Sequence, residues 1–107
     1  MTAPRPMCDW PRLVVHVDPA CRFGQPFVRG PSCETVAELV WVGEDLEAIC
    51  ADYDLSRPEA LLSCWYIATH GTKAWRHRWK GWLEASAVLI AKGQYDEVTD
   101  PPERNDA

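Results

Sequence analysis

The sequence lacks the residue patterns on which most catalytic and metal-binding sites depend. Its five cysteines are odd in number and widely spaced, and no Cys-x-x-Cys pair is present. This argues against a zinc site and against a disulfide scaffold. Its three histidines are scattered, and neither a serine–histidine–aspartate arrangement nor a phosphate-binding loop occurs. We therefore expect no enzyme activity, no catalytic or metal-binding residues and no cofactor.

Long apolar runs are also missing. No segment approaches the roughly 20 apolar residues of a membrane-spanning helix. Residues 1–11 contain prolines but no apolar segment of the kind found in a signal peptide. We expect a cytoplasmic protein with no membrane association. With 107 residues, of which 47% are hydrophobic, the chain has the size and composition of one globular domain.

Basic residues are fewer than acidic ones, which disfavours nucleic-acid binding because DNA attracts cations. The formal net charge is −5, but the charge is unevenly distributed. Residues 35–71 carry seven acidic side chains and one basic, whereas residues 72–92 carry one acidic and five basic. Residues 93–107 carry five acidic and one basic. The sequence therefore predicts an acidic domain, a short basic helix and an acidic tail.

The chain divides into four predicted segments. Residues 1–12, with three prolines, are interpreted as a flexible arm, and residues 93–107 as a disordered acidic tail. Residues 13–71 form the predicted helix-turn-helix domain, and residues 72–92 form a single basic, tryptophan-rich helix that ends before a glycine.

The predicted domain opens with a short β element. Residues 13–17 are rich in valine, and residues 27–28 form a second extended piece that ends at Gly30-Pro31. Two such short strands are marginally stable alone. We therefore expect them to pack on the helices or to pair with another chain.

Helical periodicity then predicts three helices, over residues 32–42, 45–51 and 56–69. Ser32 or Thr35 is suited to cap the first helix, Gly43 to end it, and Ser56 with Glu59 to form a capping box at the third. The second and third helices match a helix-turn-helix, in which the later helix enters the major groove. The alternative is two helices that pack in the core without a DNA partner. The predicted fold class is mainly α: a short N-terminal β element, a helix-turn-helix three-helix bundle and a C-terminal tryptophan-rich helix.

Two groups of side chains are candidate DNA contacts. On the third helix the candidates are Arg57, Ser63, Tyr66 and His70, among which only Arg57 can make a bidentate contact to guanine. The basic helix interleaves bases with aromatic residues, a pattern typical of phosphate contacts. Its candidates, joined by Arg29 from the β element, are Lys73, Arg76, Arg78 and Lys80. The alternative is a solvated basic face above a buried tryptophan stripe.

Three tryptophans of the basic helix are spaced to share one face. Trp75, Trp79 and Trp82 stand at positions i, i+4 and i+7. Because tryptophan and arginine are enriched at protein interfaces, we predict that this face is a partner interface. Burial of the same face in the core is the alternative.

Several short motifs follow one another along the chain: Asp18-Pro19, Gly24-Gln25-Pro26, Val28-Arg29-Gly30, Gly43 and Asp52-Tyr53-Asp54-Leu55-Ser56. Their order resembles the antitoxin-like family known as domain of unknown function 433. Its members commonly show Asp-Pro, Gly-x-Pro and an apolar-x-Gly step before a helix, then a glycine before an acidic helix, and Asp-Tyr-x-Leu-[Ser/Thr] before the last helix. The family usually has Thr-Arg after the second glycine, where this chain has Pro31-Ser32. Its common pattern also lacks the tryptophan-rich helix and the acidic tail.

The resemblance implies a dimeric helix-turn-helix antitoxin that binds operator DNA and a toxin protein. We therefore expect a homodimer that binds double-stranded DNA as a transcriptional regulator, with a toxin as a further partner. The alternative is a protein-binding module that does not bind DNA. Such a module would use the acidic residues 44–59 and the acidic tail to sequester a basic partner.

Overall fold

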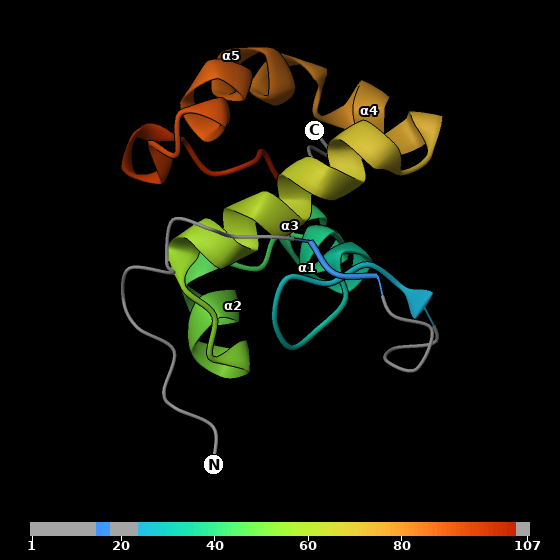
Figure 1. Ribbon diagram of the computed structural model, residues 1–107. Helices are drawn as coiled ribbons and strands as arrows, with labels where there is room; N and C mark the ends of the chain where they lie inside the picture. Colours follow the sequence, from blue (N-terminus) through green and yellow to red (C-terminus); the bar gives the residue numbers. More distant parts are fainter. Residues whose placement is uncertain (1–14, 18–23, 105–107) are drawn as a thin grey trace.

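The computed structural model describes residues 15–17 and 24–104, and this part of the chain is mainly helical. Its elements are α1 (Cys33–Trp41), α2 (Leu46–Tyr53), α3 (Arg57–His70), α4 (Lys73–Arg78), α5 (Lys80–Ala91) and the short 3₁₀ turn η3 (Tyr95–Glu97). In Figure 1, α3 runs through the middle of the molecule, with α1 and α2 on one side and α4 and α5 on the other. α3 contacts every other element of this set, so it is the centre of the core.

Local capping signals define α1 as the sequence predicts. The Ser32 hydroxyl accepts the backbone N–H of Thr35 at 3.2 Å and thereby satisfies a donor of the first turn. Gly43, with φ of +103°, follows the end of the helix, and its N–H donates to the Val40 carbonyl at 3.1 Å. One face of α1, which includes Val36 and Val40, is buried against α3.

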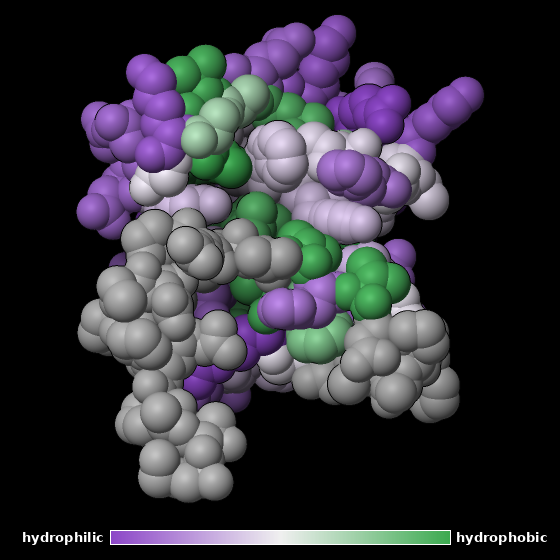
Figure 2. Space-filling view, viewed as in Figure 1, coloured by the Kyte–Doolittle hydropathy of each residue, from purple (hydrophilic) through white to green (hydrophobic). Residues whose placement is uncertain are grey.

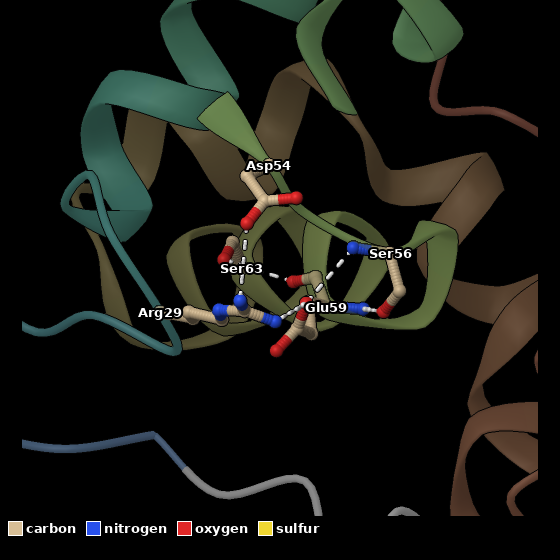
Figure 3. A network of polar contacts seen from close by, with 5 residues as sticks. All are labelled: Arg29, Asp54, Ser56, Glu59 and Ser63. Carbon is tan, nitrogen blue, oxygen red and sulfur yellow. Dashed lines mark hydrogen bonds and ion pairs between the residues drawn. The ribbon is translucent and has the colours of Figure 1, made fainter. Parts of the chain in front are cut away.

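The joint between α2 and α3 has three residues, Asp54, Leu55 and Ser56. Asp54 ends α2 in the left-handed conformation, with φ of +56°. The predicted capping box is confirmed: the Glu59 N–H donates to the Ser56 hydroxyl at 3.2 Å, and the Ser56 N–H donates to the Glu59 carboxylate at 2.8 Å. Arg29 belongs to the loop before α1. It forms ion pairs with Asp54 of this joint and with Glu59 of α3 (Figure 3).

The predicted N-terminal β element is not present as strands in the described residues. Two isolated antiparallel bridges take its place, His16 with Phe27 and Phe27 with Ser32. The chain bends directly after Phe27, so no second pair of residues can extend the ladder. Residues 13 and 14, and the arm predicted over residues 1–12, lie outside the described residues.

The single helix predicted over residues 72–92 is wrong, because the structure divides it at Trp79 into α4 and α5. Trp79 has φ of −113° and ψ of 23°, away from helical values. Its backbone still accepts from the Leu83 N–H at 2.8 Å, so the two helices remain joined by a distorted turn. This turn lets both helices follow the surface of α3 while the Trp79 side chain stays completely buried.

The prediction of a disordered acidic tail is wrong for residues 93–104, which fold back onto the helices. The indole N–H of Trp79 donates to the Pro102 carbonyl at 2.7 Å, and that of Trp82 donates to the Thr99 carbonyl at 2.8 Å. Val98 is only 2% exposed. Buried indole donors need acceptors, and the backbone of this segment supplies them. Residues 105–107 lie outside the described part of the chain.

The described helices are all short or amphipathic. None is both long enough and apolar enough to cross a membrane.

Candidate nucleic-acid interface

The predicted recognition helix, α3, is the most buried helix of the fold rather than a protruding one. Among its fourteen residues only His70 is exposed. Ser63 is 1% exposed, and its hydroxyl donates to the Glu59 carbonyl at 3.0 Å, inside the same helix. A recognition helix must present a free face to the groove. The prediction that Ser63 contacts DNA is therefore wrong, because neighbouring elements cover it.

Arg57, the candidate for guanine recognition, is engaged within the chain. Its guanidinium forms an ion pair with Asp100 and also donates to the Val98 carbonyl. Both partners belong to the C-terminal segment that packs over α3. Arg57 therefore holds this segment, and both terminal nitrogens of its guanidinium are engaged within the chain.

Arg29 is likewise committed to its own chain. Its guanidinium lies 3.2 Å from the Asp54 carboxylate and 3.7 Å from that of the buried Glu59 (Figure 3). The Arg29 side chain is about half exposed, so the pairs contribute little stability on their own. Their effect is to fix Arg29 beside carboxylates, where it is a poor phosphate ligand.

Tyr66 and His70 form a stacked pair at the C-terminal end of α3. Their ring centroids are 4.5 Å apart and their planes differ by 10°. The Thr69 hydroxyl lies 2.7 Å from Nδ1 of His70 and fixes the orientation of the imidazole. Thr69, which neighbours His70, is also the residue whose carbonyl accepts from Arg76 of α4.

Four exposed cations lie along α4 and at the first residue of α5, and we name them the basic corner: Lys73, Arg76, Arg78 and Lys80. No acidic residue occurs in the sequence between Glu59 and Glu84. None of the four cations pairs with a carboxylate of the described residues. Figure 2 shows hydrophilic side chains over α4, at the upper right of the view. This is the one cluster of candidate residues that the structure brings together and leaves open to solvent within residues 15–17 and 24–104.

One hydrogen bond and two cation–π contacts hold the arginines of the basic corner in place. Arg76 donates to the Thr69 carbonyl at 2.9 Å, at the C-terminal end of α3. The Arg78 guanidinium lies 4.8 Å from the ring centroid of Trp75 and 5.0 Å from that of Trp41, within cation–π range. Side chains held in this way lose less conformational entropy when they bind a phosphate.

The predicted partner interface of Trp75, Trp79 and Trp82 is wrong, because all three are core residues. They are 5%, 0% and 6% exposed, respectively. Trp41 packs edge-on against Trp75 and Trp79, with centroids 6.4 Å apart in both pairs. Sequence reasoning missed Trp41 because it lies on a different helix. Its presence completes an aromatic cluster that fills the space between α1 and α4–α5.

The opposite side of α3 is acidic. The exposed carboxylates of α1, α2 and their connections are Glu34, Glu38, Glu44, Asp45, Glu47, Asp52 and Asp54. Only Asp54 of this group forms an ion pair with a described residue. α1, α2 and their connections thus form a carboxylate-rich surface. Further exposed carboxylates lie on α5, η3 and the C-terminal segment: Glu84, Asp96, Glu97, Asp100 and Glu103.

The described cysteines are free thiols and do not form a reactive site. Cys33 and Cys64 are completely buried, and this burial raises the pKa of each thiol. Both therefore stay protonated and unreactive at neutral pH. Within the described ranges, no group of three or more His, Cys, Asp or Glu side chains is placed to hold a metal ion.

No family model, no curated protein and no solved structure matches this chain. The resemblance to domain of unknown function 433 therefore stays a prediction.

Proposed function

We propose that this protein is a small DNA-binding regulator that contacts the phosphate backbone through the basic corner. The observation that carries the proposal is the set of four exposed cations, unpaired with carboxylates of the described residues, in a stretch of sequence without acidic residues. Cations of this kind supply the sequence-independent part of DNA affinity.

The negative net charge does not cancel this local attraction. In Figure 1 the acidic helices α1 and α2 lie mainly on the other side of α3 from α4, although Trp41 at the end of α1 packs against Trp75 and Trp79. Exposed charges that are separated in solvent by more than the Debye length, about 8 Å at physiological ionic strength, are largely screened from one another. Distant carboxylates therefore weaken the attraction of a phosphate to the four cations less than nearby ones do.

Because α3 is mostly buried, the proposed binding relies on phosphate contacts and not on contacts of α3 with bases. Phosphate contacts position a protein on DNA but do not read base sequence. The proposed binding is consequently weak in sequence preference and strong in salt dependence. The antitoxin-type role, the homodimer and the toxin partner rest on the family resemblance alone and belong to the same proposal.

Fluorescence anisotropy with a labelled DNA duplex, measured across a series of salt concentrations, tests this function. We expect the double variant Lys73→Gln/Lys80→Gln to bind more weakly to every duplex. Its plot of log affinity against log salt should be shallower by roughly two, since each lost phosphate contact removes about 0.9 from the slope. Both lysines are exposed and form no ion pair with a described residue, so stability should not change.

Lys92→Gln is the matched control, because this lysine is exposed at the far end of α5, about 18 Å along the helix from Lys80. It should retain the wild-type slope. Absence of salt-dependent binding by the wild-type protein at low ionic strength would rule out the DNA-binding function.

A second candidate function is favoured by the acidic surface. Its seven exposed carboxylates offer a basic protein partner a dense set of opposite charges. A stable complex that forms without DNA, and that Glu38→Gln/Glu47→Gln weakens while Lys73→Gln/Lys80→Gln does not, would support this function instead.

A further inference from the structure

Tyr66 and His70 stack in such a way that one face of the imidazole stays open to solvent. The two rings are nearly parallel, with planes 10° apart and centroids 4.5 Å apart, so the phenol covers one face of the imidazole. Tyr66 is half-buried, whereas His70 is exposed. No ring of another described residue contacts His70. His70 is therefore the outer ring of the stack, and its second face can accept a further planar group.

The imidazole is held in a fixed orientation. The Thr69 hydroxyl lies 2.7 Å from Nδ1 of His70 and 2.9 Å from the Trp65 carbonyl, so it connects the edge of the ring to the helix backbone. The stack on Tyr66 restrains the ring at its face. A ring restrained at one edge and one face loses little conformational entropy when a ligand stacks on it. The open face of His70 is thus a preformed surface.

Two cations of the basic corner lie beside this ring. Arg76 donates at 2.9 Å to the carbonyl of Thr69, the residue directly before His70. This bond uses one of the five N–H donors of the guanidinium, which forms no ion pair with a described carboxylate. Lys73, the first residue of α4, is exposed and follows His70 by three positions. An open aromatic face therefore lies next to positive charge, in a stretch of sequence without acidic residues.

A flat aromatic group joined to a phosphate fits this arrangement, and each nucleotide of a single strand has this composition. Proteins that bind single-stranded nucleic acid combine aromatic rings, on which the bases stack, with cations that contact the backbone. Histidine is among the residues that serve as such rings. In a duplex the base faces are covered by neighbouring base pairs, and a base must leave the stack before a protein can reach its face. The open ring is therefore useful only for an unpaired base.

We propose that His70, Arg76 and Lys73 form a binding site for one unpaired nucleotide of single-stranded DNA. The base stacks on the open face of the imidazole, and the adjoining phosphates contact Arg76 and Lys73. Charge favours a nucleotide over an aromatic side chain of a protein, because every base of a strand is accompanied by a phosphate.

This proposal rests on the proposed function, because the basic corner must first attract DNA. A duplex makes only the phosphate contacts, whereas the exposed end of α3 adds a stacking contact where a base is unpaired. Stacking of this kind depends little on which base is present. The site therefore gives a preference for unpaired DNA and not for a particular sequence.

Fluorescence anisotropy with the wild-type protein and two single strands tests the proposal. The probes are a labelled oligothymidylate of about 12 nucleotides and a strand of the same length with abasic sites in place of all bases. Both carry the same phosphates. Wild type should bind the oligothymidylate at least about fivefold more tightly, because stacking on one ring contributes at least this factor. This comparison does not depend on the folding of a variant.

Variants at two exposed histidines assign the effect to one ring. His70→Ala should bind the oligothymidylate at least about fivefold more weakly than wild type, with duplex binding within about twofold of wild type, since a duplex makes only phosphate contacts. His70→Phe keeps an aromatic face and should restore most of the affinity. His77→Ala is the matched control, because His77 is exposed on α4 but stacks on no ring of a described residue. It should bind as wild type does.

The outcomes separate this proposal from the proposed function. Equal binding of the oligothymidylate and the abasic strand, together with salt-dependent binding of a duplex, would overturn the stacking site and leave the DNA-binding function intact. So would a His70→Ala variant that binds the oligothymidylate as wild type does. Absence of salt-dependent binding to every probe would overturn both. Thymidine monophosphate that binds as tightly as the strand would also overturn the proposal, because it would assign the site to a free nucleotide.

Discussion

Cys64 lies at the centre of α3 without exposed surface, and burial raises the pKa of its thiol above the usual value of 9.0. In the folded protein the thiol keeps its proton, whereas in the unfolded chain it ionises above this value. The higher pKa of the folded thiol therefore makes the free energy of unfolding depend on pH. This free energy is unaffected by the thiol below about pH 9 and falls as the pH rises further. The same argument applies to Cys33, which is also completely buried and has a raised pKa.

We therefore predict that the free energy of unfolding falls between about pH 8 and about pH 10, with a slope that approaches 1.4 kcal/mol per pH unit for each such thiol. Urea denaturation across this range measures it. Cys64→Ala is less stable overall, because it leaves a cavity, but its decline with pH should be smaller than that of wild type. Cys50→Ala, at a half-buried thiol, should retain most of the wild-type decline. Identical slopes for wild type and Cys64→Ala would contradict the argument.

Individual glycines in the α3–α5 region respond differently to a methyl group. A Cβ at Gly81, in the first turn of α5, would meet no atom within 4 Å. A Cβ at Gly71, between α3 and α4, would lie 2.4 Å from the Ile67 carbonyl oxygen, which real contacts do not allow. An alanine at position 81 therefore fits and has a higher helix propensity than glycine. The backbone at position 71 depends on the absence of a side chain.

At the scale of elements, we predict opposite effects for these two substitutions. Gly81→Ala should stabilise the protein by about 0.5–1 kcal/mol, because alanine restricts the unfolded chain and favours the helix. Gly71→Ala should destabilise it by about 1–3 kcal/mol, because α4 must shift away from α3. Chemical denaturation of both variants measures the difference. If Gly71→Ala proves neutral, the corner between α3 and α4 is looser than its geometry indicates.

Helix boundaries that depend on neighbouring residues could be predicted from the sequence. Ser32, Gly43 and the Ser56–Glu59 box act within a few positions, so their patterns contain the necessary information. The division of residues 72–92 into α4 and α5 could not be predicted in this way. It depends on Trp79, whose indole partner, Pro102, lies 23 residues further along the chain.

The same distinction between neighbouring and distant partners applies to the candidate site. The basic corner could be predicted, because charge is a property of residue type and exposed lysines and arginines need no distant partner. The burial of Ser63 and the ion pair between Arg57 and Asp100 could not be predicted, since both follow from how other elements cover α3. One signal was present: apolar residues occur on every side of α3, which is typical of a buried helix rather than a recognition helix.

At the scale of the whole molecule, α3 is shared between two layers of helices. α1 and α2 cover one side of it, and α4, α5 and η3 cover the other. The sequence predicts a domain boundary at residue 71, but a cut there would remove one of these two layers. The folded unit described by the structure extends to residues 98–104, whose carbonyls satisfy the buried indoles of Trp79 and Trp82.

We accordingly predict that a chain ending at residue 71 does not keep fixed tertiary structure, because the uncovered side of α3 exposes apolar side chains to water. It should lose its near-UV circular dichroism and bind a hydrophobic dye while retaining some helix. A chain ending at residue 92 keeps α4 and α5 but leaves two indole donors without their carbonyl acceptors. Its free energy of unfolding should fall by roughly 3–6 kcal/mol, since it loses two hydrogen bonds worth about 0.5–1.5 kcal/mol each and the burial of Val98, worth about 1.5–3 kcal/mol. Cooperative unfolding of the shorter chain, with near-UV signals of its own, would show instead that residues 13–71 are an independent domain and that the later helices are an appendage.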